Sequence, residues 1–105
     1  MTLKSTLSPG ERLIALLLEV RSHLARPGTD FAWSSWADGA AALAEIDGLL
    51  AQVRSGSVLK RKLDRLFAPT GDLQEISISN GWGDEFLRLA NAYDDAVAVL
   101  NLLSH

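Results

Sequence analysis

The sequence has no cysteine, and its 105 residues include only two histidines, His23 and His105. Without cysteine the chain cannot form a disulfide framework, a cysteine-ligated zinc site, an iron–sulfur cluster or a thiol nucleophile. Two histidines cannot supply a three-histidine metal site. We therefore expect neither a metal ion nor a cofactor.

Excess positive charge and long apolar runs are also missing. Ten Lys and Arg residues against thirteen Asp and Glu residues give a net charge of −3, whereas nucleic-acid-binding domains are typically basic. Hydrophobic residues make up 48% of the chain, yet no run reaches the roughly 18 apolar residues of a membrane span. The N-terminal segment lacks the apolar region and cleavage site of a signal peptide. We expect a soluble cytoplasmic protein with no membrane contact.

The residues that are present repeat with helical periodicity. Ser8, Pro9 and Glu11 have the spacing of a capping box with proline at the first helical position. Apolar side chains then recur every three or four residues, which is typical of one face of a helix: Leu13, Leu16, Leu17, Val20 and Leu24. Glu19 and His23 fall on the predicted polar side of this helix.

The same periodicity predicts an all-α, single-domain bundle over residues 1–105, with four main helices and one short helix. The second helix is predicted to begin near Ser34 or Ser35, with Asp38 in its first turn. The expected helices cover approximately 9–26, 35–54, 58–67, 72–79 and 84–103.

Residues 72–80 allow two interpretations. Glu75–Ser79 alternates polar and apolar residues as a strand does, and Asn80-Gly81 is a hairpin signal. Residues 82–86 do not alternate, so a hairpin would lack its second strand. We therefore favour a short helix with Leu73 and Ile76 or Ser77 facing inward, ended by Gly81 in the left-handed conformation.

Four basic residues fall within the predicted helix 58–67: Lys60, Arg61, Lys62 and Arg65. They suggest a phosphate-binding face, and with the following segment they could imitate a helix-turn-helix. The alternative is a solvated face on which Lys60 pairs with Asp64 one turn later. The following segment has no arginine to bind guanine. A nucleic-acid-binding regulator is thus an alternative function, not the favoured one.

No arrangement of residues predicts catalysis or metal binding. Asp84 and Asp94 would be about 15 Å apart along one helix, too far to share an ion, and Asp84 is placed to pair with Arg88. Glu19 and His23 are one turn apart, but a catalytic pair would need a third partner. We therefore expect no enzyme.

The tryptophans are the most informative residues. Trp36 fits the apolar stripe of the second helix and is expected in the core. Trp33 and Trp82 lie in predicted turns, where they either close the ends of the bundle or form a recognition surface. The residues predicted to bind a partner are Trp33, Trp82, Arg88, Arg26, Lys60 and Arg61.

A third interpretation is a small-ligand binder or enzyme with a pocket near Trp33, Asp47 and Trp82. Asp47 lies at the edge of the apolar stripe of the second helix, where a carboxylate needs a donor. A backbone or tryptophan N–H is the expected donor.

Three stretches of sequence carry a resemblance to known proteins: Asp30-Phe31-x-Trp33-Ser34-x-Trp36, Leu66-Phe67-x-Pro69-x-Gly71-x-Leu73-Gln74-Glu75 and Gly81-Trp82-x-Asp84-Glu85-Phe86. This pattern resembles small all-helical bacterial proteins of unknown function, some of them of an immunity or accessory type. It spans residues 30–95 and consists of packing and turn residues. The resemblance implies a helical fold in a bacterial cytoplasm and assigns no catalytic residue.

These observations together favour a non-enzymatic protein-interaction module, similar to an immunity protein that masks a toxin or to an adaptor. Its partner would be another protein. Self-association is a further expectation, because Ile14 and Leu18 make the first helix apolar around much of its circumference.

Overall fold

The computed structural model describes residues 8–32, 34–57 and 60–103, with side chains described up to residue 100. Within these ranges the chain forms helices and no strand, which confirms the all-α prediction. The helices are α1 Pro9–Leu24, α2 Gly39–Arg54, α3 Lys60–Leu66, α4 Asp72–Ser79 and α5 Gly83–Leu103. Trp33 and the predicted first two residues of the third helix lie outside the described residues.

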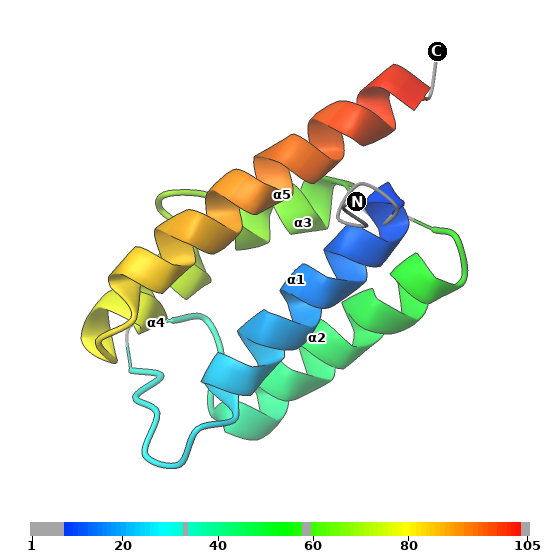
Figure 1. The fold of residues 1–105 in the computed structure, drawn as a ribbon. Coiled ribbons are helices and arrows are strands. Elements are labelled where there is room, and N and C mark those ends of the chain that lie inside the picture. The colour runs from blue at the N-terminus through cyan, green and yellow to red at the C-terminus, as the bar shows by residue number, and fades with distance from the viewer. Residues whose placement is uncertain (1–7, 33, 58–59, 104–105) are drawn as a thin grey trace, which may run out of the picture.

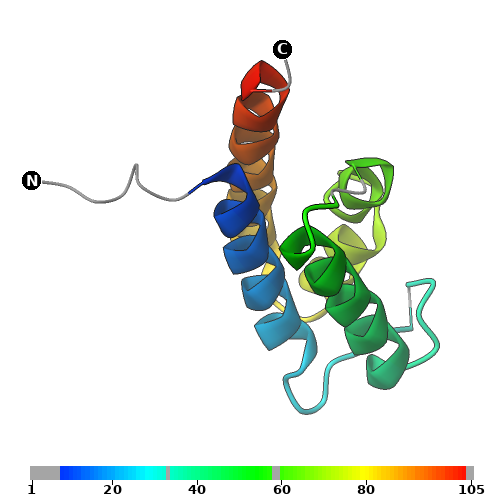
Figure 2. The ribbon, with the colours of Figure 1, turned by 90° about the vertical axis from the view of Figure 1, so that its right-hand side faces the viewer.

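The helices form two layers around one core. Figures 1 and 2 show α1 and α5 running antiparallel in one layer, with α2 and α3 in the other. α1 packs directly against both α2 and α5, and α5 also packs against α4. The core therefore lies between α1 and the elements that surround it.

The predicted start and buried face of α1 are confirmed. The Ser8 hydroxyl accepts a hydrogen bond from the Glu11 N–H at 3.1 Å, and the Glu11 carboxylate accepts one from the Ser8 N–H at 3.0 Å. The predicted apolar residues are all buried: Leu13, Leu16, Leu17, Val20 and Leu24. The capping box satisfies two backbone donors at the exposed helix end.

α2 begins at Gly39, later than the predicted start at residue 35. Asp38 is the N-cap, and its carboxylate accepts a hydrogen bond from the Ala41 N–H at 2.9 Å. Ser35 is unavailable as a cap because both its N–H and its hydroxyl donate to Asp72 in α4. The contact of Ser35 with a distant segment thus leaves Asp38 as the residue that caps the start of α2.

α4 is the predicted short helix, and the hairpin alternative is wrong. Leu73, Ile76 and Ser77 are buried, so the spacing of three and four residues determines which side chains reach the core. Gly81 has φ +81° and ends the segment in the left-handed conformation as predicted. The Asn80 side chain bonds back to the N–H and the C=O of Asp30, which fixes the loop 25–38 to this helix end.

Gly71 joins α3 to α4 and provides a stability test. A Cβ at this position would lie 2.5 Å from the backbone oxygen of Arg65, a contact that only a backbone shift can relieve. We expect Gly71→Ala to lower the free energy of unfolding by about 1–3 kcal/mol. Chemical denaturation measures the change.

Gly48→Ala is the matched control. Gly48 lies within α2, and a Cβ there would meet no atom within 4 Å. This variant should gain roughly 0.5–1 kcal/mol, because alanine favours a helix more than glycine does. Equal effects of the two substitutions would contradict the close backbone contact at Gly71.

Candidate functional site

His23 and Trp82 form a buried stack. Their ring centroids are 4.3 Å apart with planes inclined by 10°, and the residues are only 9% and 4% exposed. The prediction that His23 lies on a polar face is therefore wrong, because Trp82 reaches α1 from the α4–α5 turn and covers it. Of the two alternatives that the sequence left open for Trp82, closing the end of the core is confirmed, and the surface anchor is wrong.

Two of the predicted partner-binding arginines surround this stack. Arg88 pairs with Glu19 of α1 at 2.6 Å and with Glu85 at 3.0 Å, rather than with Asp84 as the sequence suggested. Glu19 therefore neutralises Arg88 instead of forming an acid–base pair with His23. Arg26 is exposed and close enough to lower the pKa of His23, although burial of the ring lowers that pKa most.

The basic helix does not present a uniformly positive surface. Lys60 pairs with Asp64 at 2.8 Å, as predicted, and Arg61 is exposed. Lys62 and Arg65 line a hollow of about 420 Å³ together with acidic residues from neighbouring elements, Glu45 of α2 and Asp72 of α4. The cations and anions of this surface are interleaved.

The residues of the predicted ligand pocket do not all converge. Asp47 is exposed and accepts a hydrogen bond from Arg21 Nε at 2.7 Å, so its donor is an arginine and not a backbone or tryptophan N–H. Arg21 and His23 are two residues apart on α1 and so project to nearly opposite sides of it. Asp47 and Trp82 therefore lie on different sides of α1, and Trp33 is outside the described residues.

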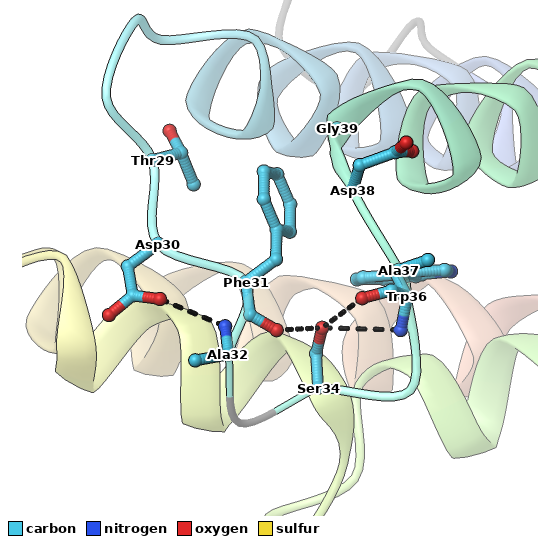
Figure 3. A pocket seen from close by; sticks show the side chains of 9 residues that line it. All are labelled: Thr29, Asp30, Phe31, Ala32, Ser34, Trp36, Ala37, Asp38 and Gly39. Atoms are coloured by element: carbon cyan, nitrogen blue, oxygen red, sulfur yellow. Dashed lines mark hydrogen bonds between the residues drawn. The ribbon is translucent and has the colours of Figure 1, made fainter.

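The loop 25–38 encloses an open hollow of about 600 Å³ (Figure 3). Phe31 extends toward Gly39, and the Ser34 hydroxyl lies among backbone atoms of Phe31 and Trp36, to which it is hydrogen-bonded. The Asp38 carboxylate caps α2, and that of Asp30 accepts from the Ala32 N–H. These polar groups are already used to hold the loop and the helix end.

Trp36 confirms its predicted place in the core. It is buried, and its indole N–H donates to Glu45 at 3.3 Å. This hydrogen bond provides the partner that a buried tryptophan N–H needs.

A third hollow, the α3–α5 groove, combines apolar residues with acidic residues at its rim. It has a volume of about 360 Å³ and lies between the end of α3 and the first half of α5. Its floor is aromatic and buried, formed by Phe67, Phe86 and Tyr93. Its rim is formed by Asp64, Pro69, Leu87, Asn91 and Asp94.

The floor of the groove is fixed by two contacts. The rings of Phe67 and Tyr93 stack with centroids 4.6 Å apart, and the Tyr93 hydroxyl donates to Asp64 at 2.5 Å. Burial and the neighbouring Asp64 raise the pKa of Tyr93, so this hydroxyl stays protonated. The groove has a preformed shape but no activated nucleophile or base.

One of the two most exposed large aliphatic residues of the described chain, Leu87, lines this groove, and the other, Ile78, lies near the start of the same helix. Ile78 is 62% exposed and Leu87 is 59% exposed. A Cβ at Gly83 would lie 3.8 Å from Ile78, and Leu87 follows Gly83 by one turn on the same side of α5. Leu87 thus lines the groove, and Ile78 of α4 lies near the start of α5, one turn before Leu87.

No direct signal in the sequence indicates this site. Leu87 and Ile78 each read as one more apolar residue beside a helical stripe, and the groove exists only once α3 and α5 are in contact. Within the described residues, no group of three His, Asp or Glu side chains is placed to hold a metal ion. No helix in those ranges is long and apolar enough to cross a membrane.

Comparison with known proteins gives no relative on which to base a function. No family model, no curated protein and no solved structure matches the chain. A function can therefore be inferred only from the residues and geometry of this chain.

The His23–Trp82 stack predicts a pH-dependent stability. The pKa of His23 is lowered in the folded chain, so folding favours the neutral ring. The neutral His23 ring contributes fully to the free energy of unfolding above the pKa of histidine in the unfolded chain, which is about 6.5. This contribution is lost as the pH falls below that value. We expect the free energy of unfolding to decrease between about pH 7 and pH 5.5, measured by denaturation at each pH.

His23→Phe is the control for this dependence, because it keeps a flat ring against Trp82 but cannot titrate. Its unfolding free energy should change less over the same pH interval. An identical pH dependence in the two proteins would show that His23 is not responsible.

Proposed function

We propose that this protein is a non-enzymatic interaction module that binds and masks another protein through the α3–α5 groove and the adjoining Ile78. The observation that carries this proposal is the exposure of Leu87 on the rim of a preformed hollow, with the exposed Ile78 near the start of the same helix. The proposed contact surface does not include Trp82, Arg26, Arg61 or Arg88, which the sequence suggested as partner-binding residues.

The energetics favour burial of this surface by a partner. Single exposed leucines are common on soluble proteins, but Leu87 borders an aromatic-floored hollow, and a second exposed aliphatic residue, Ile78, lies near the start of the same helix. Complete burial of one such side chain contributes about 1.5–3 kcal/mol. Leu87 and Ile78 can therefore provide much of the affinity of a moderate interface.

The distribution of reactive groups supports a binding role over catalysis. His23 is covered by Trp82, and the Tyr93 hydroxyl is committed to Asp64. Asp47 and Glu19 join α1 to α2 and α5 through ion pairs on the exposed surface, and Glu85 pairs with Arg88 within α5. These groups make contacts that stabilise the fold, and they lie on several different faces of the molecule.

Leu87→Gln and Ile78→Gln test the proposed surface without adding charge. Both positions are exposed, so each substitution should change the unfolding free energy by less than about 0.5 kcal/mol. We expect immobilised wild-type chain to retain a specific protein from an extract of its source cell, and the double variant to retain about a tenth or less of it. Quantitative mass spectrometry measures the retained protein.

Leu18→Gln is the matched control, because Leu18 is 44% exposed on α1 and undergoes the same chemical change. It should retain the partner at the wild-type level. The proposal is wrong if no protein is retained specifically, or if all the variants retain it equally.

A further inference from the structure

We infer that the occupant of the α3–α5 groove is an amphipathic helix of the partner, with basic residues at both ends of its apolar face. This inference depends on the proposed function, because it specifies the partner for the same surface. It follows from the shape of the groove and from the charges that flank Leu87.

The backbone of the groove favours a helix over an extended peptide. A peptide that binds as a β-strand adds to the edge of a sheet, and the described chain has no strand. The wall formed by α5 is a helix whose own N–H and C=O groups are paired within it. Recognition must therefore use side chains, and a helix presents apolar side chains three and four residues apart to such a groove.

Two acidic residues flank Leu87 on the exposed side of α5. Asp84 precedes Leu87 by three residues and Asp94 follows it by seven, so all three lie on one side of the helix. Neither carboxylate has an ion-pair partner among the described residues. The neighbouring Arg88 pairs instead with Glu19 of α1 and with Glu85 of α5. Asp64 on the opposite wall is already paired with Lys60.

This arrangement specifies the spacing of the partner's charges. Asp84 and Asp94 are about 15 Å apart along α5, from the rise of 1.5 Å per residue. A partner helix lying along the groove would place two lysines or arginines about ten residues apart to meet them, with a large apolar residue between them to contact Leu87. The carboxylates supply selectivity for a basic partner, and the apolar contact supplies most of the affinity.

Two synthetic helical peptides test this inference on the full-length chain. Both carry leucines spaced to form one apolar face. One has lysines at the two flanking positions, about ten residues apart, and the other has glutamates at these positions. Amide chemical shifts of the labelled protein locate the binding site and give the dissociation constants.

We expect the lysine peptide to shift the amide signals of residues 84–94 and to bind roughly tenfold more tightly than the glutamate peptide at low salt. Asp94→Lys should remove most of this preference. Asp95→Lys is the matched control, because Asp95 is the next residue and faces a different hollow with Arg12 of α1. It should retain the preference.

Three outcomes would overturn the inference. The first is equal binding of the two peptides, or equal effects of Asp94→Lys and Asp95→Lys. The second is binding of neither peptide while capture from the extract still depends on Leu87, which would leave the proposed function in place. The third is a dimer of the wild-type chain in light scattering that Leu87→Gln dissociates, because the occupant would then be a second copy.

Discussion

The packing of α1 between α2 and α5 is the interaction on which the rest of the structure depends. The buried stripe from Leu13 to Leu24 contacts elements on both sides, so one helix removes apolar surface from water in two interfaces at once. Ion pairs reinforce the two sides, Arg21 with Asp47 toward α2 and Arg88 with Glu19 toward α5. Exposed pairs of this kind contribute little stability. Burial of apolar side chains therefore provides most of the stability of the α1 interfaces, and the ion pairs contribute to the relative orientation of the helices.

The position of α5 has a direct consequence for the proposed binding surface. Its inner side is used by α1 and α4, and Arg88 turns toward α1 to pair with Glu19. The outer side of its first half is left with an exposed leucine between two acidic residues, above the aromatic pair of Phe67 and Tyr93. The groove thus lies on the side of α5 that does not pack against α1 or α4. Its floor is held by the core, whereas the carboxylates beside Leu87 have no ion-pair partner among the described residues.

Local features of the sequence predicted the helices well, because a cap or a buried stripe involves residues only three or four positions apart. The Ser8 capping box and the end of α4 at Gly81 are of this kind. Features that depend on distant segments were missed. The sequence could not show that Ser35 would bond to Asp72, or that Trp82 would cover a histidine of α1. The groove was missed for the same reason, since its walls come together only in the folded chain.

Photo-crosslinking in the source cell tests the central claim most directly. A benzophenone side chain replaces Leu87 in the groove or, as the matched site, Leu18 on α1. The account predicts one discrete crosslinked protein of defined mass from position 87 and none from position 18, with the crosslinked peptide of that protein rich in lysine or arginine. Crosslinks from position 18 alone, or none from either position, would contradict it.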